Sequence, residues 1–150
     1  MSSTLTNLIY HAVFSTKDRY NLIRIEFEEE LHSYICGIIK GEDGSVIRIN
    51  GTADHLHILL KCPAKISFSD MMRKIKGNSS KWLNEGLSAG IKFGWQNGYG
   101  AFSVSESIVP RVSEYIINQK AHHRNLSFKE EFILLLEKNK VKYDEQYLWD

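Results

Sequence analysis

Two histidines lie two residues apart inside a segment that otherwise has the composition of a buried β-strand. Because side chains on a strand alternate between its two faces, His55 and His57 emerge side by side on one face. Leu56, Ile58 and Leu60 then point the other way, into a core. Two neutral imidazoles at this spacing can bind one divalent cation. A pair of surface or hydrogen-bonded histidines on a half-exposed strand is an alternative that so short a pattern leaves open.

A second candidate group lies in a predicted helix towards the end of the chain. Tyr115 and Gln119 are four residues apart, so they share one face of a helix, about 6 Å apart along its axis. Ile108, Val112 and Ile116 give this helix an apolar side that can dock on the body of the protein. A tyrosine at such a position can equally be a packing residue, and the glutamine a solvated one. The pair alone therefore does not indicate a catalytic site, and only its combination with motifs elsewhere in the chain does.

The composition is typical of a single globular domain. The chain has 150 residues, 43% of them hydrophobic and 25% charged, and its net charge is only +1. This balance provides no overall attraction to nucleic acid, so any basic surface must be local. Cys36 and Cys62 are isolated in sequence and are expected to be free thiols. No signal peptide or membrane-spanning run is recognisable, so we expect a cytoplasmic protein with no membrane partner.

The elements that must position both groups alternate between strand and helix patterns. The Asn50-Gly51 dipeptide is a strong hairpin signal and is expected to turn one strand into the strand that carries the histidines. The expected order is a strand over 5–15, a helix over 24–41, a strand over 45–50, a strand over 53–61, a helix from Ser67 or Ser69 to about Leu83, a strand over 93–104 interrupted at 96–98, and helices over roughly 108–123 and 127–138.

This βαββαβ order predicts an α+β fold of the ferredoxin-like (RRM-like) type. Its four-stranded antiparallel sheet carries both helices on one face, and two additional C-terminal helices follow, the first with Tyr115. The right-handed crossover rule places the first and third strands in the middle, so the histidines lie on a central strand. The face without helices is expected to be open for chemistry. We expect one domain over 1–150, with a body over about 1–106 and the tyrosine helix and last helix over about 107–150.

Six motifs, in order along nearly the whole chain, resemble a known family. They are HAVFSTK (11–17), DHLH (54–57), KGNSSKWL (76–83), WQNGYGAFSV (95–104), YIINQ (115–119) and HHR (122–124). With these motifs the chain resembles the single-tyrosine transposases of the HUH nuclease superfamily, of the insertion-sequence-200 type. Ordered motifs at matching separations are far more specific than either residue pair alone.

The resemblance implies an enzyme, an HUH single-strand DNA endonuclease and transposase (DNA strand transferase). Such an enzyme cleaves and transfers DNA through a covalent 5′-phosphotyrosine at the hairpin-bearing ends of a mobile element. Position by position, Tyr115 matches the family's catalytic nucleophile, and His55, His57 and Gln119 match its three protein ligands to Mg²⁺ or Mn²⁺. The resemblance also implies a homodimer in which the tyrosine helix of one subunit can complete the metal site of the other. The residues themselves do not decide between assembly within one chain and assembly across two.

Local charge is consistent with single-stranded DNA that bears hairpin ends as the partner. From Lys61 to Lys81 the chain has six basic residues against one acidic residue, and further cations surround Tyr115. Such clusters contact backbone phosphates, although any single lysine can also be a solvated surface charge. The candidate DNA-binding residues are Lys17, Arg19, Arg73, Lys76, Lys81, Lys120, His122 and Arg124.

Two alternative functions remain compatible with the sequence. A domesticated HUH endonuclease would process chromosomal hairpins with the same chemistry, and only genomic context would distinguish it from the enzyme of a mobile element. A non-catalytic single-strand nucleic-acid-binding protein on the same sheet would need no divalent metal.

Overall fold

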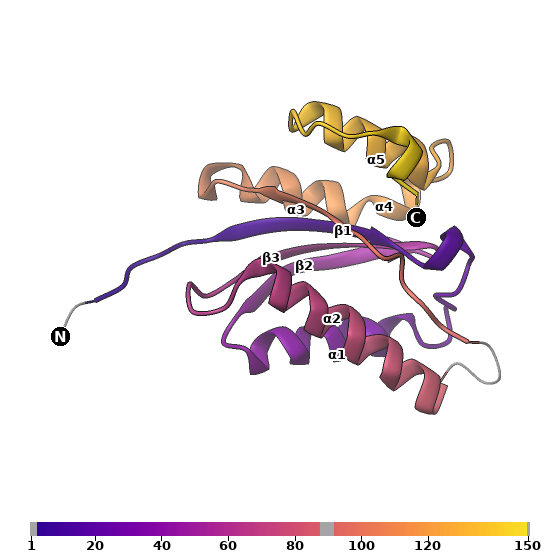
Figure 1. The fold of residues 1–150 in the computed structure, drawn as a ribbon, viewed down its shortest axis with the longest axis horizontal. Helices are drawn as coiled ribbons and strands as arrows, with labels where there is room; N and C mark the ends of the chain where they lie inside the picture. The colour runs from indigo at the N-terminus through magenta and orange to yellow at the C-terminus, as the bar shows by residue number, and fades with distance from the viewer. Residues whose placement is uncertain (1–2, 88–91, 150) are drawn as a thin grey trace.

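A four-stranded antiparallel sheet forms the centre of the computed structural model, which describes residues 3–87 and 92–149 (Figure 1). Its order is β2-β3-β1-β4, so the first and third strands are central, as predicted. The α+β class is therefore confirmed. The strands are β1 (Ile9–Ser15), β2 (Ser45–Thr52), β3 (His55–Lys61) and β4 (Gly100–Ser103).

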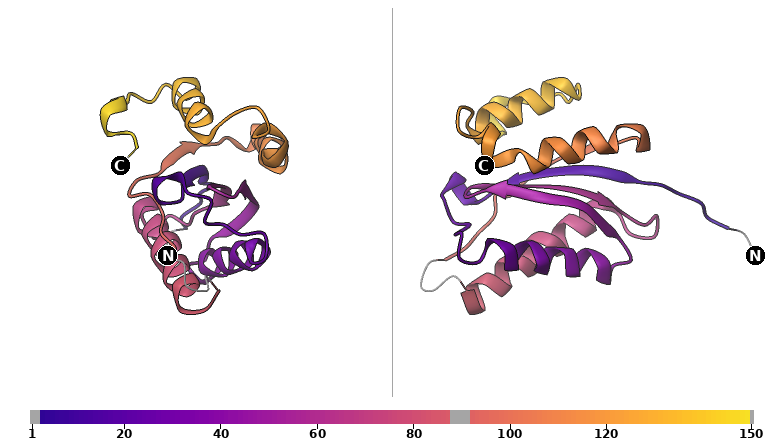
Figure 2. Two further views of the ribbon diagram at one scale, coloured as in Figure 1. Left: turned by 90° about the vertical axis from the view of Figure 1, so that its right-hand side faces the viewer. Right: turned by 180° about the vertical axis from the view of Figure 1, so that it is seen from behind.

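Helices cover both faces of this sheet, which gives the molecule three layers (Figure 2). One face carries α1 (Glu28–Gly41) and α2 (Phe68–Trp82), and the other carries α3 (Val109–Ile117), α4 (Gln119–His122) and α5 (Phe128–Lys138). The face that we expected to be open is therefore covered, because Ile116 of α3 is buried in one cluster with Leu59 of β3. The short helical segments are η1 (Lys17–Arg19), η2 (Leu83–Leu87), η3 (Glu106–Ile108) and η4 (Glu145–Tyr147).

Strand β3 is buried on both faces. Its side chains alternate, so that those on one face pack in the core and those on the other face belong to the candidate site. Leu56, Ile58 and Leu60 belong to the large core that also contains the buried residues of α1 and α2. His55 and His57 point to the opposite face, beneath the C-terminal helices. A slip of one residue in register would exchange the two sets, so burial of the leucines and the isoleucine fixes where the imidazoles lie.

The predicted strands 5–15 and 93–104 are shorter in the structure. Leu5 is 90% exposed and lies before β1, which begins at Ile9. The predicted last strand is reduced to β4 and a single bridge between Trp95 and Thr16. Two backbone hydrogen bonds flank this bridge, from Lys17 N to Gly94 O at 2.8 Å and from Gln96 N to Ser15 O at 2.9 Å. Trp95 also packs in the core, and its Nε1 donates to Ser79 Oγ at 2.9 Å.

The turn between β2 and β3 lies at Ala53 and Asp54, not at Asn50-Gly51 as predicted. Gly51 is instead a residue of β2 that pairs with Leu56. A Cβ atom built on Gly51 would lie only 2.1 Å from the backbone oxygen of His55. Glycine is therefore required here by a close approach of two backbones and not by turn geometry.

We expect Gly51→Ala to lower the free energy of unfolding by about 1–3 kcal/mol, because the β2–β3 pairing must shift to admit a methyl group. Gly37→Ala is the matched control, since Gly37 is exposed on α1 and a Cβ there meets nothing within 4 Å. This control should gain about 0.5–1 kcal/mol from helix propensity. Denaturant unfolding measures both, and equal stabilities of the two variants would contradict the close approach.

Two further expectations concern the cysteines and the membrane. Cys36 and Cys62 are both free thiols in the structure. Over residues 3–87 and 92–149, no helix combines the length and the apolar character that crossing a membrane requires.

Candidate active site

The imidazoles of His55 and His57 are fully buried, and the Nδ1 atom of each lies within hydrogen-bond distance of a neighbouring side chain. His55 Nδ1 lies 2.7 Å from Asp54 Oδ1 and 3.0 Å from Thr52 Oγ1, both in the turn that precedes β3. His57 Nδ1 lies 2.8 Å from Nε2 of His11, which comes from the adjacent central strand. These contacts occupy the Nδ1 atoms and direct both Nε2 atoms into the same space, as partners of metal-ligating histidines do.

The other two predicted site residues meet the histidines from the C-terminal helices. Gln119 is fully buried, and its Oε1 lies 2.8 Å from His55 Nε2. Tyr115 is half-buried, with its ring centroid 5.8 Å from that of His57. The structure therefore brings all four predicted residues together within one chain.

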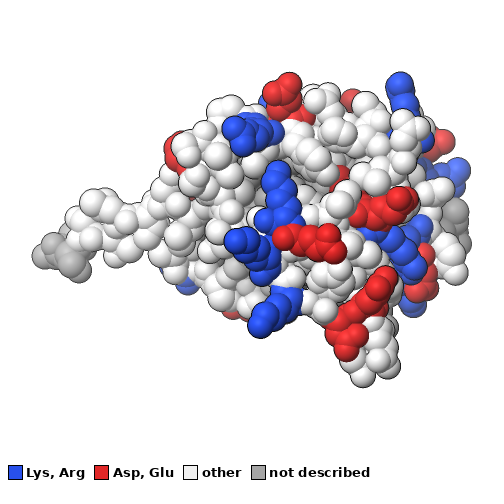
Figure 3. Space-filling model, turned by 90° about the horizontal axis from the view of Figure 1, so that it is seen from above, with Lys and Arg blue, Asp and Glu red and all other residues white. Residues whose placement is uncertain are grey.

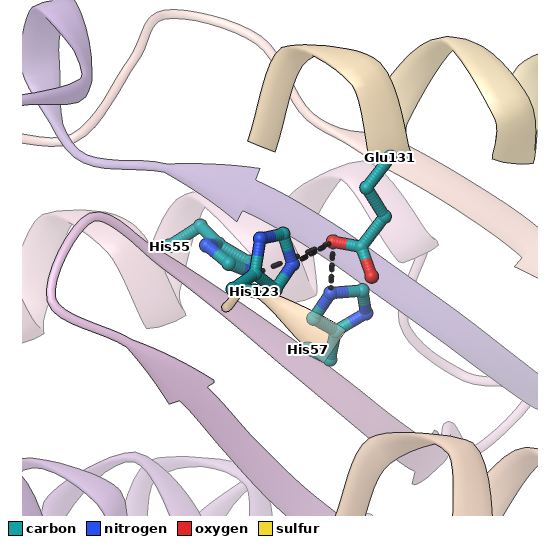
Figure 4. A group of neighbouring side chains, drawn as sticks. All are labelled: His55, His57, His123 and Glu131. Carbon is teal, nitrogen blue, oxygen red and sulfur yellow. Dashed lines mark hydrogen bonds and ion pairs between the residues drawn. The ribbon is translucent and has the colours of Figure 1, made fainter. Parts of the chain in front are cut away.

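At the centre of this cluster lies Glu131, a residue of α5 that we did not predict from the sequence (Figure 4). Its side chain is only 1% exposed. Its Oε1 atom lies 2.8 Å from His123 Nε2, 3.0 Å from His57 Nε2 and 3.4 Å from His55 Nε2. Three imidazole nitrogens thus converge on one carboxylate oxygen.

The second oxygen of Glu131 faces different partners. Oε2 accepts a hydrogen bond from Gln119 Nε2 at 2.8 Å and another from the hydroxyl group of Tyr115. The carboxylate therefore connects the imidazoles on one side to the phenol on the other.

A capping box at the start of α5 helps to position the Glu131 carboxylate. Ser127 accepts from the backbone of Glu130, whose side chain accepts from the backbone of Ser127, so the helix start is fixed at Phe128 and Glu131 lies at the end of its first turn. Phe128 and Phe132 are buried on the same side of α5. An acidic residue on the apolar side of an amphipathic helix is the sequence signal that could have identified Glu131.

The predicted helix over 108–123 is divided at Asn118, whose backbone (φ −90°, ψ 17°) separates α3 from α4. Asn50 of β2 fixes the end of α3, because its Nδ2 donates to the backbone oxygens of Ile116 and Ile117, both at 3.0 Å. Such oxygens have no partner within the helix itself. Asn50 therefore positions the segment between Tyr115 and Gln119 instead of forming the predicted turn.

Burial and the central carboxylate give the three sheet histidines different protonation states. Burial, with a smaller contribution from His57, lowers the pKa of His11 to about 3, and burial outweighs Glu131 to lower the pKa of His57 to about 4. Burial also disfavours charge on His55, but hydrogen bonds to Asp54 and Glu131 outweigh it and raise the pKa of His55 to about 9. At neutral pH His11 and His57 are therefore neutral and His55 is charged.

Burial and hydrogen bonds also shift the pKa values of the Glu131 carboxyl group and the Tyr115 phenol. Burial opposes charge on Glu131, but hydrogen bonds from the three imidazoles hold its pKa far below the usual range for a carboxyl group. Burial raises the pKa of Tyr115, and the hydrogen bond to Glu131 raises it further. The phenol is thus protonated beside an ionised carboxylate.

The donor set fits a divalent cation. His55, His57, His123 and Glu131 each offer one ligand atom, and these atoms all lie within 4.8 Å of one another. The neutral state of His57 and the contacts behind both Nδ1 atoms are those that a nitrogen ligand needs. A cation bound there would take the place of the Nε2 proton of His55.

Two of the candidate DNA-binding residues lie beside this cluster and are already engaged. Lys120 Nζ lies 3.0 Å from a carboxylate oxygen of Glu28 and donates to the backbone oxygen of Gly51 at 3.2 Å. The ring of His122 stacks on that of Tyr115, with centroids 4.9 Å apart. A pocket of about 470 Å³ opens next to them, and its lining includes Asp54, Lys120, His123 and Phe128.

A second group lies on α2, on the other face of the sheet. Arg73, Lys76, Trp95 and Tyr99 are among the residues that line a pocket of about 410 Å³. Lys76 Nζ donates to the backbone oxygen of Gly98 at 2.8 Å and lies 5.9 Å from the centroid of the Tyr99 ring. Arg73 and Lys81 are exposed, and each forms an ion pair along the helix, with Asp70 and Glu85 respectively.

The remaining candidates are Lys17, Arg19 and Arg124. Lys17 and Arg19 lie in η1 directly after β1, and the Arg19 guanidinium lies 5.4 Å from the centroid of the Trp149 ring. Arg124 is exposed after α4. On the face that carries α3 and α5, basic and acidic side chains are interspersed (Figure 3). The predicted cations therefore do not form one continuous surface.

Comparison with known proteins connects this geometry to a protein family. A family model described as "Transposase IS200 like" matches residues 4–119. The transposase for insertion sequence element IS200 of Salmonella typhimurium is 29% identical over 125 residues, which cover 79% of this chain and 81% of that protein. The ISDra2 transposase TnpA of Deinococcus radiodurans is 26% identical over 119 residues, which cover 75% of this chain and 84% of the relative.

A solved structure shares the fold. It is a REP-associated tyrosine transposase bound to a REP hairpin, and it superposes with a TM-score of 0.61 at 16% sequence identity. The match covers 82% of this chain and 74% of that one. At this identity the likeness concerns the fold.

Proposed function

The chain belongs to the family of IS200-like transposases, and we propose that it cleaves and rejoins single-stranded DNA through a covalent bond to Tyr115. The observation that supports this most strongly is the convergence of Tyr115, Gln119, His55 and His57 on one buried carboxylate. Phosphodiester cleavage needs a nucleophile in line with the leaving group and stabilisation of the developing charge. Both requirements can be met in this one cluster.

His55, His57 and Gln119 are the residues that would hold a divalent cation, Mg²⁺ or Mn²⁺. When bound, such a cation polarises an oxygen of the scissile phosphate and neutralises its developing charge. Hydrogen bonds with His11 and Asp54 keep the two imidazoles oriented. Both imidazoles are fully buried, which excludes water from their Nδ1 side. Once a cation takes the place of the Nε2 proton of His55, the side chains supply a preorganised set of two neutral imidazoles and one amide.

Tyr115 acts as the nucleophile in this proposal. Its phenolic oxygen bonds to phosphorus, the bond from phosphorus to the 3′-oxygen breaks, and the 5′-phosphate stays on the tyrosine. The phenol gives up its proton, and the departing 3′-oxygen gains one. A phenol, with an ordinary pKa of about 10, leaves more readily than an aliphatic alcohol. An incoming 3′-hydroxyl can therefore reverse the step and join strands without ATP.

Single-stranded DNA that carries hairpin ends is the proposed partner. Openings flank the cluster on two sides: the pocket beside Asp54 and His123, and a smaller one of about 210 Å³ that includes His11, Arg111, Tyr115 and Lys138. Arg111 and Lys138 can contact backbone phosphates that approach the phenol. All the proposed site residues can come from one chain, and the homodimer implied by the family resemblance stays a prediction.

Lys76 provides a pH-dependent test of DNA contact on α2. Burial lowers the pKa of Lys76 to about 8, so the ammonium is charged at pH 7 and loses its proton as the pH rises through about 8. We expect the affinity for single-stranded hairpin DNA to fall by up to about tenfold between pH 7 and pH 9. Lys76→Arg should remove most of this fall, because a guanidinium stays charged over the whole range.

Fluorescence anisotropy at constant ionic strength measures this effect. Lys40→Arg is a suitable control, because Lys40 is exposed at the end of α1. If the wild type and Lys76→Arg lose affinity in parallel as the pH rises, Lys76 does not contact the DNA.

The proposed function is tested with purified protein, labelled hairpin DNA, and Mn²⁺ or Mg²⁺. We expect a protein–DNA complex that resists denaturant, forms only with the divalent cation, and carries the DNA segment on the 3′ side of the break. Binding without any covalent complex, in the presence and absence of metal, would instead support a non-catalytic nucleic-acid-binding protein.

A further inference from the structure

We propose that Glu131 is itself a ligand to the divalent cation, so that α5 completes the metal site. This rests on the metal-dependent function proposed above. Glu131 lies beyond residues 4–119, the part of the chain that the family model matches. The carboxylate would be a fourth protein ligand beside the three expected from the resemblance.

The spacing of the donor atoms supports a common ion. Adjacent ligands of an octahedral cation with bonds of about 2.1 Å lie about 3.0 Å apart. Glu131 Oε1 lies 3.0 Å from His57 Nε2 and 3.4 Å from His55 Nε2. Gln119 Oε1 lies 2.8 Å from His55 Nε2. These separations match neighbouring positions around one ion, so binding requires only small movements of the side chains.

The charge balance supports the same conclusion. A carboxylate that is 1% exposed needs a compensating positive charge. The groups that the structure places next to this carboxylate are imidazoles, the Gln119 amide and the Tyr115 phenol. A divalent cation bound to Oε1 would supply positive charge at this place. A carboxylate oxygen also suits Mg²⁺ and Mn²⁺ better than a set of two imidazoles and one amide does.

The second oxygen links this ligand to the nucleophile. Glu131 Oε2 accepts from the Tyr115 hydroxyl and from Gln119 Nε2. Phe128 and Phe132 pack α5 against the sheet on either side of Glu131. A cation on Oε1 would therefore hold α5 in place and fix the phenol relative to the metal. We expect cation binding to stabilise the whole of α5.

Calorimetric titration of the full-length protein with Mn²⁺ in the absence of DNA tests the proposal. We expect Glu131→Gln to weaken Mn²⁺ binding by about 10–100-fold, because it keeps the shape and a side-chain carbonyl but removes the charge. Glu137→Gln is the matched control: it removes the same charge from an exposed position on the same helix. It should bind Mn²⁺ as the wild type does.

Hydrogen exchange provides a second measurement that needs no variant of Glu131. Mn²⁺ should slow amide exchange across α5 of the wild type. If Glu131→Gln does not fold, this measurement decides: slower exchange in α5 supports the proposal, and unchanged exchange overturns it.

The outcomes separate this inference from the proposed function. Equal Mn²⁺ affinities of the wild type and Glu131→Gln, with binding lost in His55→Ala, would overturn the role of Glu131 alone. No Mn²⁺ binding by the wild type would overturn the metal-dependent function together with it.

Discussion

Tyr115→Phe is expected to eliminate the covalent protein–DNA complex and to lower cleavage of hairpin-bearing single strands by at least about 10⁴-fold. Removal of a nucleophile costs this much because binding and charge stabilisation cannot replace the missing bond. The variant retains the ring that lies beside His57 and His122 and loses only the hydroxyl that donates to Glu131. Its affinity for the same DNA should therefore be unchanged. Denaturing gels measure the covalent complex, and anisotropy measures binding.

Tyr147→Phe is the control for this experiment, since Tyr147 is 65% exposed and lies in η4, outside the cluster. It should form the covalent complex at the wild-type rate. A covalent complex that persists in Tyr115→Phe would show that another residue is the nucleophile. Loss of DNA binding together with the complex would point to a structural role for the hydroxyl.

His57→Ala is expected to remove both the thermal stabilisation by Mn²⁺ and the cleavage activity, with activity lower by at least about 100-fold. A residue that only supports a metal ligand is worth about 10–100-fold, so loss of a ligand costs at least as much. The substitution also leaves Glu131 Oε1 without one of its hydrogen-bond donors, so the metal-free protein should be less stable than the wild type. Thermal unfolding with and without Mn²⁺ separates the two effects.

His32→Ala is the matched control, because His32 is a half-buried histidine on α1, on the other side of the sheet. It should keep both the Mn²⁺ shift and the activity. If His57→Ala still shows the wild-type Mn²⁺ shift, the cation binds outside the histidine pair. Addition of a chelator to the wild type should reproduce the loss of activity in His57→Ala.

Local patterns predicted the sheet and its first two helices because each carries its own periodicity. The alternation in β1 and β3 placed Leu56, Ile58 and Leu60 in the core and the histidines on the opposite face, as the structure has them. The Asn50-Gly51 signal was misleading, because the same dipeptide also suits a close backbone approach within a pair of strands. Local sequence does not distinguish these two uses of glycine.

The C-terminal helices show where local patterns become insufficient. The predicted helix over 127–138 agrees with α5, but the predicted helix over 108–123 is divided into α3 and α4. The position of these helices over the histidine face depends on contacts between distant segments, such as Ile116 with Leu59. We expected this face to be open, which would have left the imidazoles in solvent. The C-terminal helices cover it instead, so that expectation was wrong. The division at Asn118 likewise depends on Asn50, which lies on a different strand.

The site shows the same limit. The resemblance placed Tyr115, Gln119, His55 and His57 together, and the structure has them in one cluster. Glu131 was not predicted, because an acidic residue in a helix is usually solvated. Only the docking of α5 shows that this one points inward.

Diffraction from crystals grown with Mn²⁺, with data collected for anomalous scattering by manganese, tests the central geometric claim most directly. We predict one peak within about 2.3 Å of Nε2 of both His55 and His57, with the hydroxyl of Tyr115 beside the same centre, from the same chain or from a partner copy. Manganese bound away from both imidazoles, or a Tyr115 hydroxyl far from the metal in every copy, would contradict the account.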